Sequence, residues 1–142
     1  MATADDLNGV PLFTGMSDDE HGILAEWFEV SDANAGTALV SEGAEGHSFY
    51  VLLDGAAEVT VGGEAVATYG PGDYFGEMAI LGGGRRNATV TVTAPSRLLS
   101  MFGSEFRTLQ HVQPDVAAQL EETMRRRSAE LSDLHAADAG DG

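Results

Sequence analysis

The feature that most constrains the fold is a series of short apolar or alternating segments, separated by glycines, between residues 36 and 103. Each segment has the length and the period of a β-strand rather than of a helix. The expected strands are residues 39–40, 49–53, 57–61, 64–69, 88–93 and 97–101. Asp54-Gly55 and Gly62-Gly63 are tight-turn dipeptides, and the second would join two strands in a two-residue hairpin. Many short strands at this spacing predict a small barrel or a jelly roll.

Helical patterns flank this β region. Residues 7–30 are expected to be helical, because Ser17-Asp18-Asp19-Glu20 is a capping box at the start of a helix that would carry Trp27 and Phe28 into the core. After the β region, Ser104 is expected to cap a short helix, and Pro114 to open a longer one.

These patterns predict a single domain over residues 1–135. Its expected parts are N-terminal helices at 7–35, a β-roll at 36–103 and C-terminal helices at 104–134. The tail, residues 136–142, has neither bulk nor pattern, and we expect it to be flexible.

Composition and charge exclude several function classes. The chain has no cysteine and no apolar run of the roughly 20 residues that cross a bilayer, so we expect a cytoplasmic protein without a membrane partner. Its formal net charge is −16, and such a surface repels the phosphates of nucleic acids. All seven basic residues are arginine, so an anionic ligand would need a local arginine that acts against the overall field.

The glycine-rich segment at residues 70–90 has the composition of an anion site. Its glycines allow the backbone to approach a ligand closely, and residues 76–81 could form a helical turn whose free N–H groups bind an anion. A guanidinium can donate two parallel hydrogen bonds to a phosphate. The carboxylate of Glu77 would accept hydrogen bonds from hydroxyls, so the segment suits a phosphate beside a sugar hydroxyl.

Two patterns in this segment carry a family resemblance: Phe75-Gly76-Glu77-x-Ala79 and Arg86-x-Ala88-Thr89-Val90. Together they resemble the phosphate-binding cassette of cyclic nucleotide-binding domains. The similarity extends upstream through Gly36-x-x-Leu39-Val40-x-x-Gly43-x-x-Gly46-x-x-Phe49-Tyr50-Val51-Leu52-x-x-Gly55, and it covers about residues 7–134. It implies a mainly β fold with flanking helices: an eight-stranded β-roll (a double-stranded jelly roll) with an N-terminal helical segment, a short cassette helix and two C-terminal helices.

The resemblance also implies roles for the cassette residues. Glu77 would accept the ribose 2′-hydroxyl, Arg86 would pair with the exocyclic phosphate oxygens, and backbone N–H groups would complete the cradle. The expected phosphate and ribose set is Phe75, Gly76, Glu77, Met78, Ala79, Arg86, Asn87 and Ala88. Arg85 is expected to be a solvated charge. Asn87 departs from the Ala, Ser or Thr usual in the family, which leaves the nucleotide choice open at this position, and we expect cAMP rather than cGMP as the ligand.

In the family, the last helix moves over the ligand and covers the base. By that resemblance Arg127 would contact the base, and Met124 and Leu131 are apolar candidates for packing on it. The alternatives stay open: Arg127 could be a solvated member of an arginine cluster, and the two apolar residues could belong to the core.

The sequence favours nucleotide sensing over several other functions. His21, His47, His111 and His135 show no paired ligand spacing, so we expect neither an enzyme, nor a metal site, nor a prosthetic group. The acidic charge argues against direct DNA binding. A β-roll without a ligand, serving as a protein-interaction or dimerisation module, is the alternative. A sensor would act on an unidentified effector protein or associate with itself through the last helix.

Overall fold

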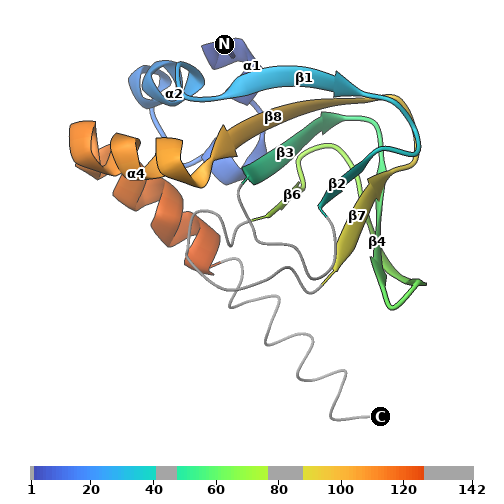
Figure 1. Ribbon diagram of the computed structural model, residues 1–142. Helices are drawn as coiled ribbons and strands as arrows, with labels where there is room; N and C mark the ends of the chain where they lie inside the picture. The colour runs from blue at the N-terminus through green and yellow to red at the C-terminus, as the bar shows by residue number, and fades with distance from the viewer. Residues whose placement is uncertain (1, 41–47, 77–87, 127–142) are drawn as a thin grey trace.

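Two antiparallel sheets form the body of the protein, and helices lie at one end of them (Figure 1). The computed structural model describes residues 2–40, 48–76 and 88–126. These residues contain eight strands: β1 (Glu29–Ala33), β2 (Ala38–Val40), β3 (Ser48–Asp54), β4 (Ala57–Val61), β5 (Glu64–Tyr69), β6 (Tyr74–Phe75), β7 (Thr89–Val92) and β8 (Ser96–Phe102). The first sheet has the order β1-β8-β3-β6 and the second the order β2-β7-β4-β5. The predicted eight-stranded β-roll is confirmed.

Strand β3 shows why the apolar run at residues 49–53 is nearly continuous. Phe49 and Val51 belong to a core shared with the helices, whereas Tyr50 and Leu52 belong to a second core between the two sheets. Successive side chains of a strand point to opposite faces. A strand covered on both faces therefore needs apolar residues at every position, not at alternate ones.

The β4–β5 hairpin follows the turn prediction. Val61 pairs with Glu64, and the two glycines between them have φ values of 60° and 86°. Both values lie in the left-handed region, as a two-residue hairpin of type I′ requires, and glycine adopts this region without steric cost. The Gly62-Gly63 prediction is confirmed.

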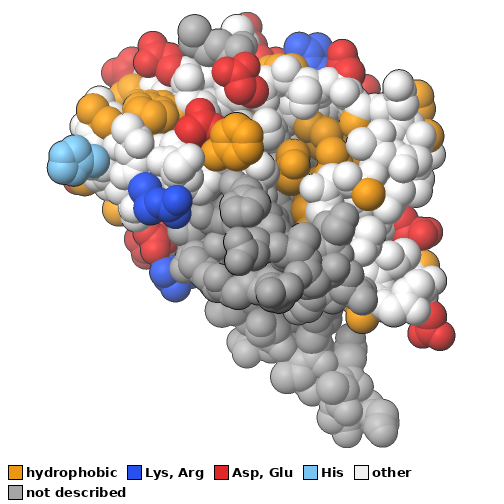
Figure 2. Space-filling view, in the orientation of Figure 1, with side chains coloured by type: hydrophobic (Ala, Val, Ile, Leu, Met, Phe, Trp, Pro, Cys, Tyr) orange, Lys and Arg blue, Asp and Glu red, His pale blue; other side chains and the backbone are white. Residues whose placement is uncertain are grey.

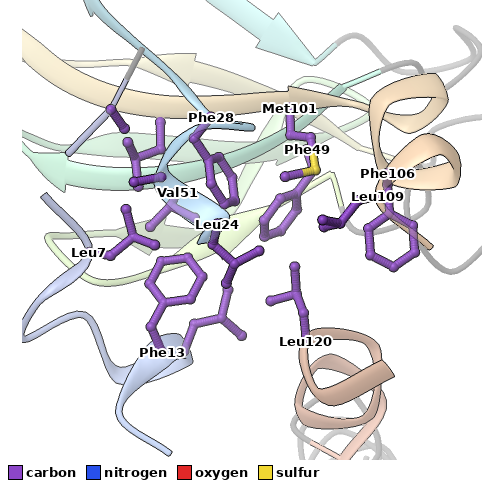
Figure 3. Packing of buried hydrophobic residues seen from close by; sticks show 14 of the residues in the cluster. Leu7, Phe13, Leu24, Phe28, Phe49, Val51, Met101, Phe106, Leu109 and Leu120 are labelled. Atoms are coloured by element: carbon purple, nitrogen blue, oxygen red, sulfur yellow. The ribbon is translucent and has the colours of Figure 1, made fainter. Parts of the chain in front are cut away.

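The helices pack on the outer face of the first sheet. They are α1 (Ala4–Leu7), the 3₁₀ turn η1 (Pro11–Phe13), α2 (Asp18–Ala25), α4 (Gly103–Val112) and a helix at 114–126. Figure 3 shows Phe13, Phe28 and Phe49 lying together in this core, with Leu120 reaching in from helix 114–126. Among the described residues, no helix is both long and apolar enough to cross a membrane.

The predicted Ser17 cap is confirmed, but the helical range 7–30 is wrong at both ends: α1 ends at Leu7, and α2 begins only at Asp18. Ser17 caps α2: its side chain accepts from the N–H of Glu20 at 3.2 Å, and the Glu20 carboxylate accepts from the N–H of Ser17 at 2.9 Å. The helix ends at Ala25, however, so Trp27 and Phe28 follow it rather than lie on it. Phe28 is nevertheless fully buried, as expected.

The prediction of helix to residue 30, and of N-terminal helices to residue 35, is wrong because residues 29–33 form strand β1. Among the described residues this strand pairs with β8 alone, and most of its side chains are exposed, so its sequence lacks the apolar alternation of a strand.

The start of α4 also differs from the prediction. The cap position is Phe102 rather than Ser104, and the Glu105 carboxylate accepts from the N–H of Phe102 at 2.9 Å. Pro114 begins the next helix, as predicted.

Candidate functional site

The candidate site begins with a turn that carries the chain from the second sheet to the first. Pro71 and Gly72 are its central residues, Gly72 has φ of 94°, and the N–H of Asp73 donates to the Gly70 carbonyl at 3.1 Å. Proline followed by a glycine of positive φ is the signature of a type II turn. The Asp73 carboxylate accepts from the N–H of Gly70 at 2.8 Å, and two backbone hydrogen bonds join the turn to Leu52 of β3. The turn therefore fixes the start of β6 against β3.

Strand β6 leads directly into the predicted cassette. Phe75 lies opposite Tyr50 in the first sheet, and the residue is only 2% exposed. The ring stacks on Tyr50 and on Tyr69, with centroids 5.3 Å away in both cases. The Phe75 side chain is thus part of the inter-sheet core, and only its backbone remains for a ligand. Gly76 follows with φ of 78°, a conformation that favours glycine.

Strand β7 receives the chain at the other end of the cassette. Thr89 to Val92 pair with β4 on one side and with β2 on the other. Val90 is 4% exposed, and Ala88 packs against the same inter-sheet core. The segment between Gly76 and Ala88 is therefore anchored at one end to an edge strand of the first sheet, and at the other to an inner strand of the second.

Most of the predicted ligand-contacting side chains lie outside the described residues. They are Glu77, Met78, Ala79, Arg86 and Asn87 of the cassette, together with Arg127 and Leu131 of the last helix. Arg85 lies outside them as well. The structure places Phe75, Gly76 and Ala88 at the two ends of the cassette, and their roles toward a ligand remain predictions.

Met124 is the one predicted base contact within the described residues. It is fully buried and belongs to the core that helix 114–126 shares with Phe106, Leu109 and Leu120. This placement supports the core alternative for Met124. Leu120 and Val116, one and two turns before it, are buried on the same face, as the 3.6-residue period of a helix requires.

Two of the described arginines lie beside carboxylates. Arg125 donates to the Glu121 carboxylate at 2.7 Å, and a terminal nitrogen of Arg97 lies 4.0 Å from the Asp6 carboxylate. Figure 2 shows acidic side chains around much of the margin of one face, where few basic ones are visible. An anion that approaches the cassette therefore meets a surface of mostly negative charge. Binding of that anion then depends more strongly on any arginine within the cassette.

The histidines of the described part do not form a metal site. The Nε2 atom of His21 lies 2.7 Å from the Phe13 carbonyl oxygen, so its ring is engaged within the N-terminal helical region. His111 is exposed on α4. Within residues 2–40, 48–76 and 88–126, no three His, Cys, Asp or Glu residues gather in a way that could hold a metal ion.

A pocket of about 480 Å³ lies between the N-terminal helices and the type II turn. Asp6, Asp54, Pro71, Gly72 and Arg97 are among its lining residues. Sequence reasoning did not identify it, because segments far apart in the chain form its walls. The stacking of Tyr50 and Tyr69 on Phe75 was missed for the same reason.

Comparison with known proteins agrees with this architecture. The family model described as "Cyclic nucleotide-binding domain" matches residues 31–111. A cAMP-dependent protein kinase regulatory subunit of Colletotrichum orbiculare is 35% identical over 107 residues, which cover 74% of this chain and 27% of that protein. A cyclic AMP receptor protein of Thermus thermophilus is 29% identical over 129 residues, 87% of this chain and 60% of that protein.

A solved structure of cAMP-bound PfPKA-R superposes with a TM-score of 0.77 at 27% identity, covering 92% of this chain and 44% of that one. This chain therefore spans less than two thirds of these relatives, and only about a quarter of the kinase subunit. The matched residues make up more than half of the chain, and the two-sheet roll agrees with the match. The chain belongs to the cyclic nucleotide-binding domain family.

Proposed function

We propose that this chain binds a cyclic nucleotide, cAMP in preference to cGMP, in the cassette at residues 75–88. One observation carries the proposal: the cassette pattern starts at the end of β6 and finishes at the start of β7, within a roll of the cyclic nucleotide-binding family. The names of the relatives, which include regulatory subunits of cAMP-dependent kinases and a cyclic AMP receptor protein, support cAMP as the ligand.

The chemistry of the cassette suits this ligand. Arg86 would neutralise the cyclic phosphate through paired hydrogen bonds, and the Glu77 carboxylate would accept the ribose 2′-hydroxyl. Backbone N–H groups of Gly76, of Met78 or Ala79, and of Ala88 would supply the remaining donors. The aromatic ring of Phe75 is buried in the core, so we propose that this residue contributes through its backbone alone.

We further propose that binding changes the position of the last helix. Arg127 and Leu131 would contact the base, which would favour a closed arrangement of that helix by the difference in affinity between the two states. Replacing Arg127 with alanine should weaken nucleotide binding and reduce closure while leaving the cassette intact. An unchanged calorimetric affinity would contradict this role.

The function that we propose is regulatory binding, without catalysis. The family is a ligand-binding one, and the acidic surface disfavours a direct nucleic-acid partner. The output would pass to an effector protein or to a second copy through the last helix. Size-exclusion chromatography with and without cAMP distinguishes these routes, because only self-association changes the elution of the chain by itself.

The decisive experiment is calorimetric titration of the protein with cAMP and with cGMP, beside an Arg86→Ala variant. A hydrogen bond to a charged group is worth about 1.5–3 kcal/mol, so the variant should bind roughly 10- to 150-fold more weakly.

The neighbouring Arg85→Ala variant is the matched control. It removes the same charge from the adjacent position, where we expect a solvated side chain, and it should bind nearly as well as the unchanged protein. If the unchanged protein binds neither nucleotide, the proposal fails, and a ligand-free β-roll that serves as a protein-interaction module becomes the better interpretation.

A further inference from the structure

Three aromatic rings form a continuous stack at the start of the cassette. The Phe75 ring stacks on those of Tyr50 and Tyr69, with interplanar angles of 27° and 2°. Tyr50 lies on β3 and Phe75 on β6, both in the first sheet, whereas Tyr69 is the last residue of β5 in the second sheet. The stack therefore crosses from one sheet to the other.

The stack lies where the chain itself makes the same crossing. Strand β5 ends at Tyr69, the type II turn follows, and β6 is only two residues long. So short a strand has few ladder hydrogen bonds of its own: within the part of the chain that the structure describes, β6 pairs with β3 alone, and the turn before it adds two backbone hydrogen bonds to Leu52. Stacked aromatic rings add about 0.5–1.5 kcal/mol per pair beyond the area they bury, so the two stacks are a substantial part of what fixes β6.

The stack fixes the backbone at the start of the cassette. Gly76, whose φ is 78°, follows Phe75 directly, and its N–H is one of the donors proposed for the phosphate. A preformed donor binds more tightly than one that must first be ordered, because the affinity falls in proportion to the fraction of molecules that are competent to bind.

We propose that Tyr50 and Tyr69 are positioning residues for cyclic nucleotide binding: by stacking on Phe75, one from each sheet, they hold the backbone of Gly76 at the start of the cassette in its binding conformation. The inference rests on the proposed function and deepens it. They act through Phe75 rather than by touching the nucleotide. Because they would position the part that holds phosphate and ribose, they should affect every nucleotide that shares those groups.

The test is calorimetric titration of Tyr69→Ala and Tyr69→Phe with cAMP and with cGMP. Removing one stack should weaken binding of both nucleotides by the same factor, about threefold to tenfold. Tyr69→Phe keeps the ring, so it should retain the affinity of the unchanged protein for both ligands. A residue that touched the base would instead change the ratio of the two affinities.

A control separates positioning from general destabilisation. Val30→Ala removes a partly buried side chain from β1, the edge strand on the opposite side of the first sheet. It should lower thermal stability while leaving both affinities unchanged.

Four results would overturn the inference: full affinity in Tyr69→Ala, unequal losses for the two nucleotides, no rescue by phenylalanine, or an equal loss in Val30→Ala. Failure of the unchanged protein to bind either nucleotide would instead refute the proposed function itself, and the positioning role with it.

Discussion

Gly76 offers the most direct link between the backbone geometry and the proposed function. It connects β6 to the cassette with φ of 78°, inside the left-handed region. An L-residue in that region brings its Cβ close to the following carbonyl oxygen, which costs roughly 1–2 kcal/mol. Gly76→Ala therefore adds this amount of strain wherever the conformation is kept.

The strain can appear in either of two measured quantities. If the free variant keeps the positive φ, its free energy of unfolding falls by the full amount and its affinity is unchanged. If the free variant relaxes, its stability is spared, but binding must restore the strained backbone and the affinity falls by up to roughly 5- to 30-fold. The stability of the cAMP-saturated protein falls by about 1–2 kcal/mol in both cases.

The assay combines urea unfolding, with and without saturating cAMP, and calorimetric titration. Gly63→Ala is the matched control, because Gly63 also has positive φ, at 86°, and a Cβ there would meet nothing within 4 Å. Gly63 lies in the β4–β5 hairpin, so the whole cost of its substitution should appear as a lower free energy of unfolding. In Gly76→Ala, the loss of unfolding free energy and the loss of binding free energy are added together. If their sum is nearly zero, the bound cassette does not need the positive φ, and the reasoning is refuted.

Three further predictions concern stability and can be read by urea unfolding. Gly55→Ala should cost roughly 2–5 kcal/mol, because φ is 101° and an added Cβ would overlap the Ser96 hydroxyl; a smaller loss than in Gly63→Ala would contradict this. Ser17→Ala should cost about 1 kcal/mol through the lost cap of α2, and Ser17→Asn should restore most of it. Met124→Ala should lower the free energy of unfolding by about 2–5 kcal/mol, because it truncates a core side chain. A selective loss of cAMP affinity with unchanged stability would contradict this and support Met124 as a base contact.

The sequence was sufficient for those parts of the fold whose signal is local. The apolar runs at β3, β4 and β8, the Gly62-Gly63 hairpin and the Ser17 cap each depend on neighbouring residues, and the structure confirms them. Strands β1 and β6 were missed for a physical reason. One is an exposed edge strand, and the other has only two residues, so neither carries a periodic apolar pattern.

By itself, the sequence determined the chemistry that the cassette can offer: glycines for close backbone approach, one carboxylate for a sugar hydroxyl and an arginine for a phosphate. Only the tertiary structure decided that Phe75 faces the core, that Tyr50 and Tyr69 stack on it, and that Met124 belongs to the helix-side core. The type of each residue limits the bonds it can make. Which residues meet depends on pairings between strands and helices distant in the chain, and local periodicity carries no record of them.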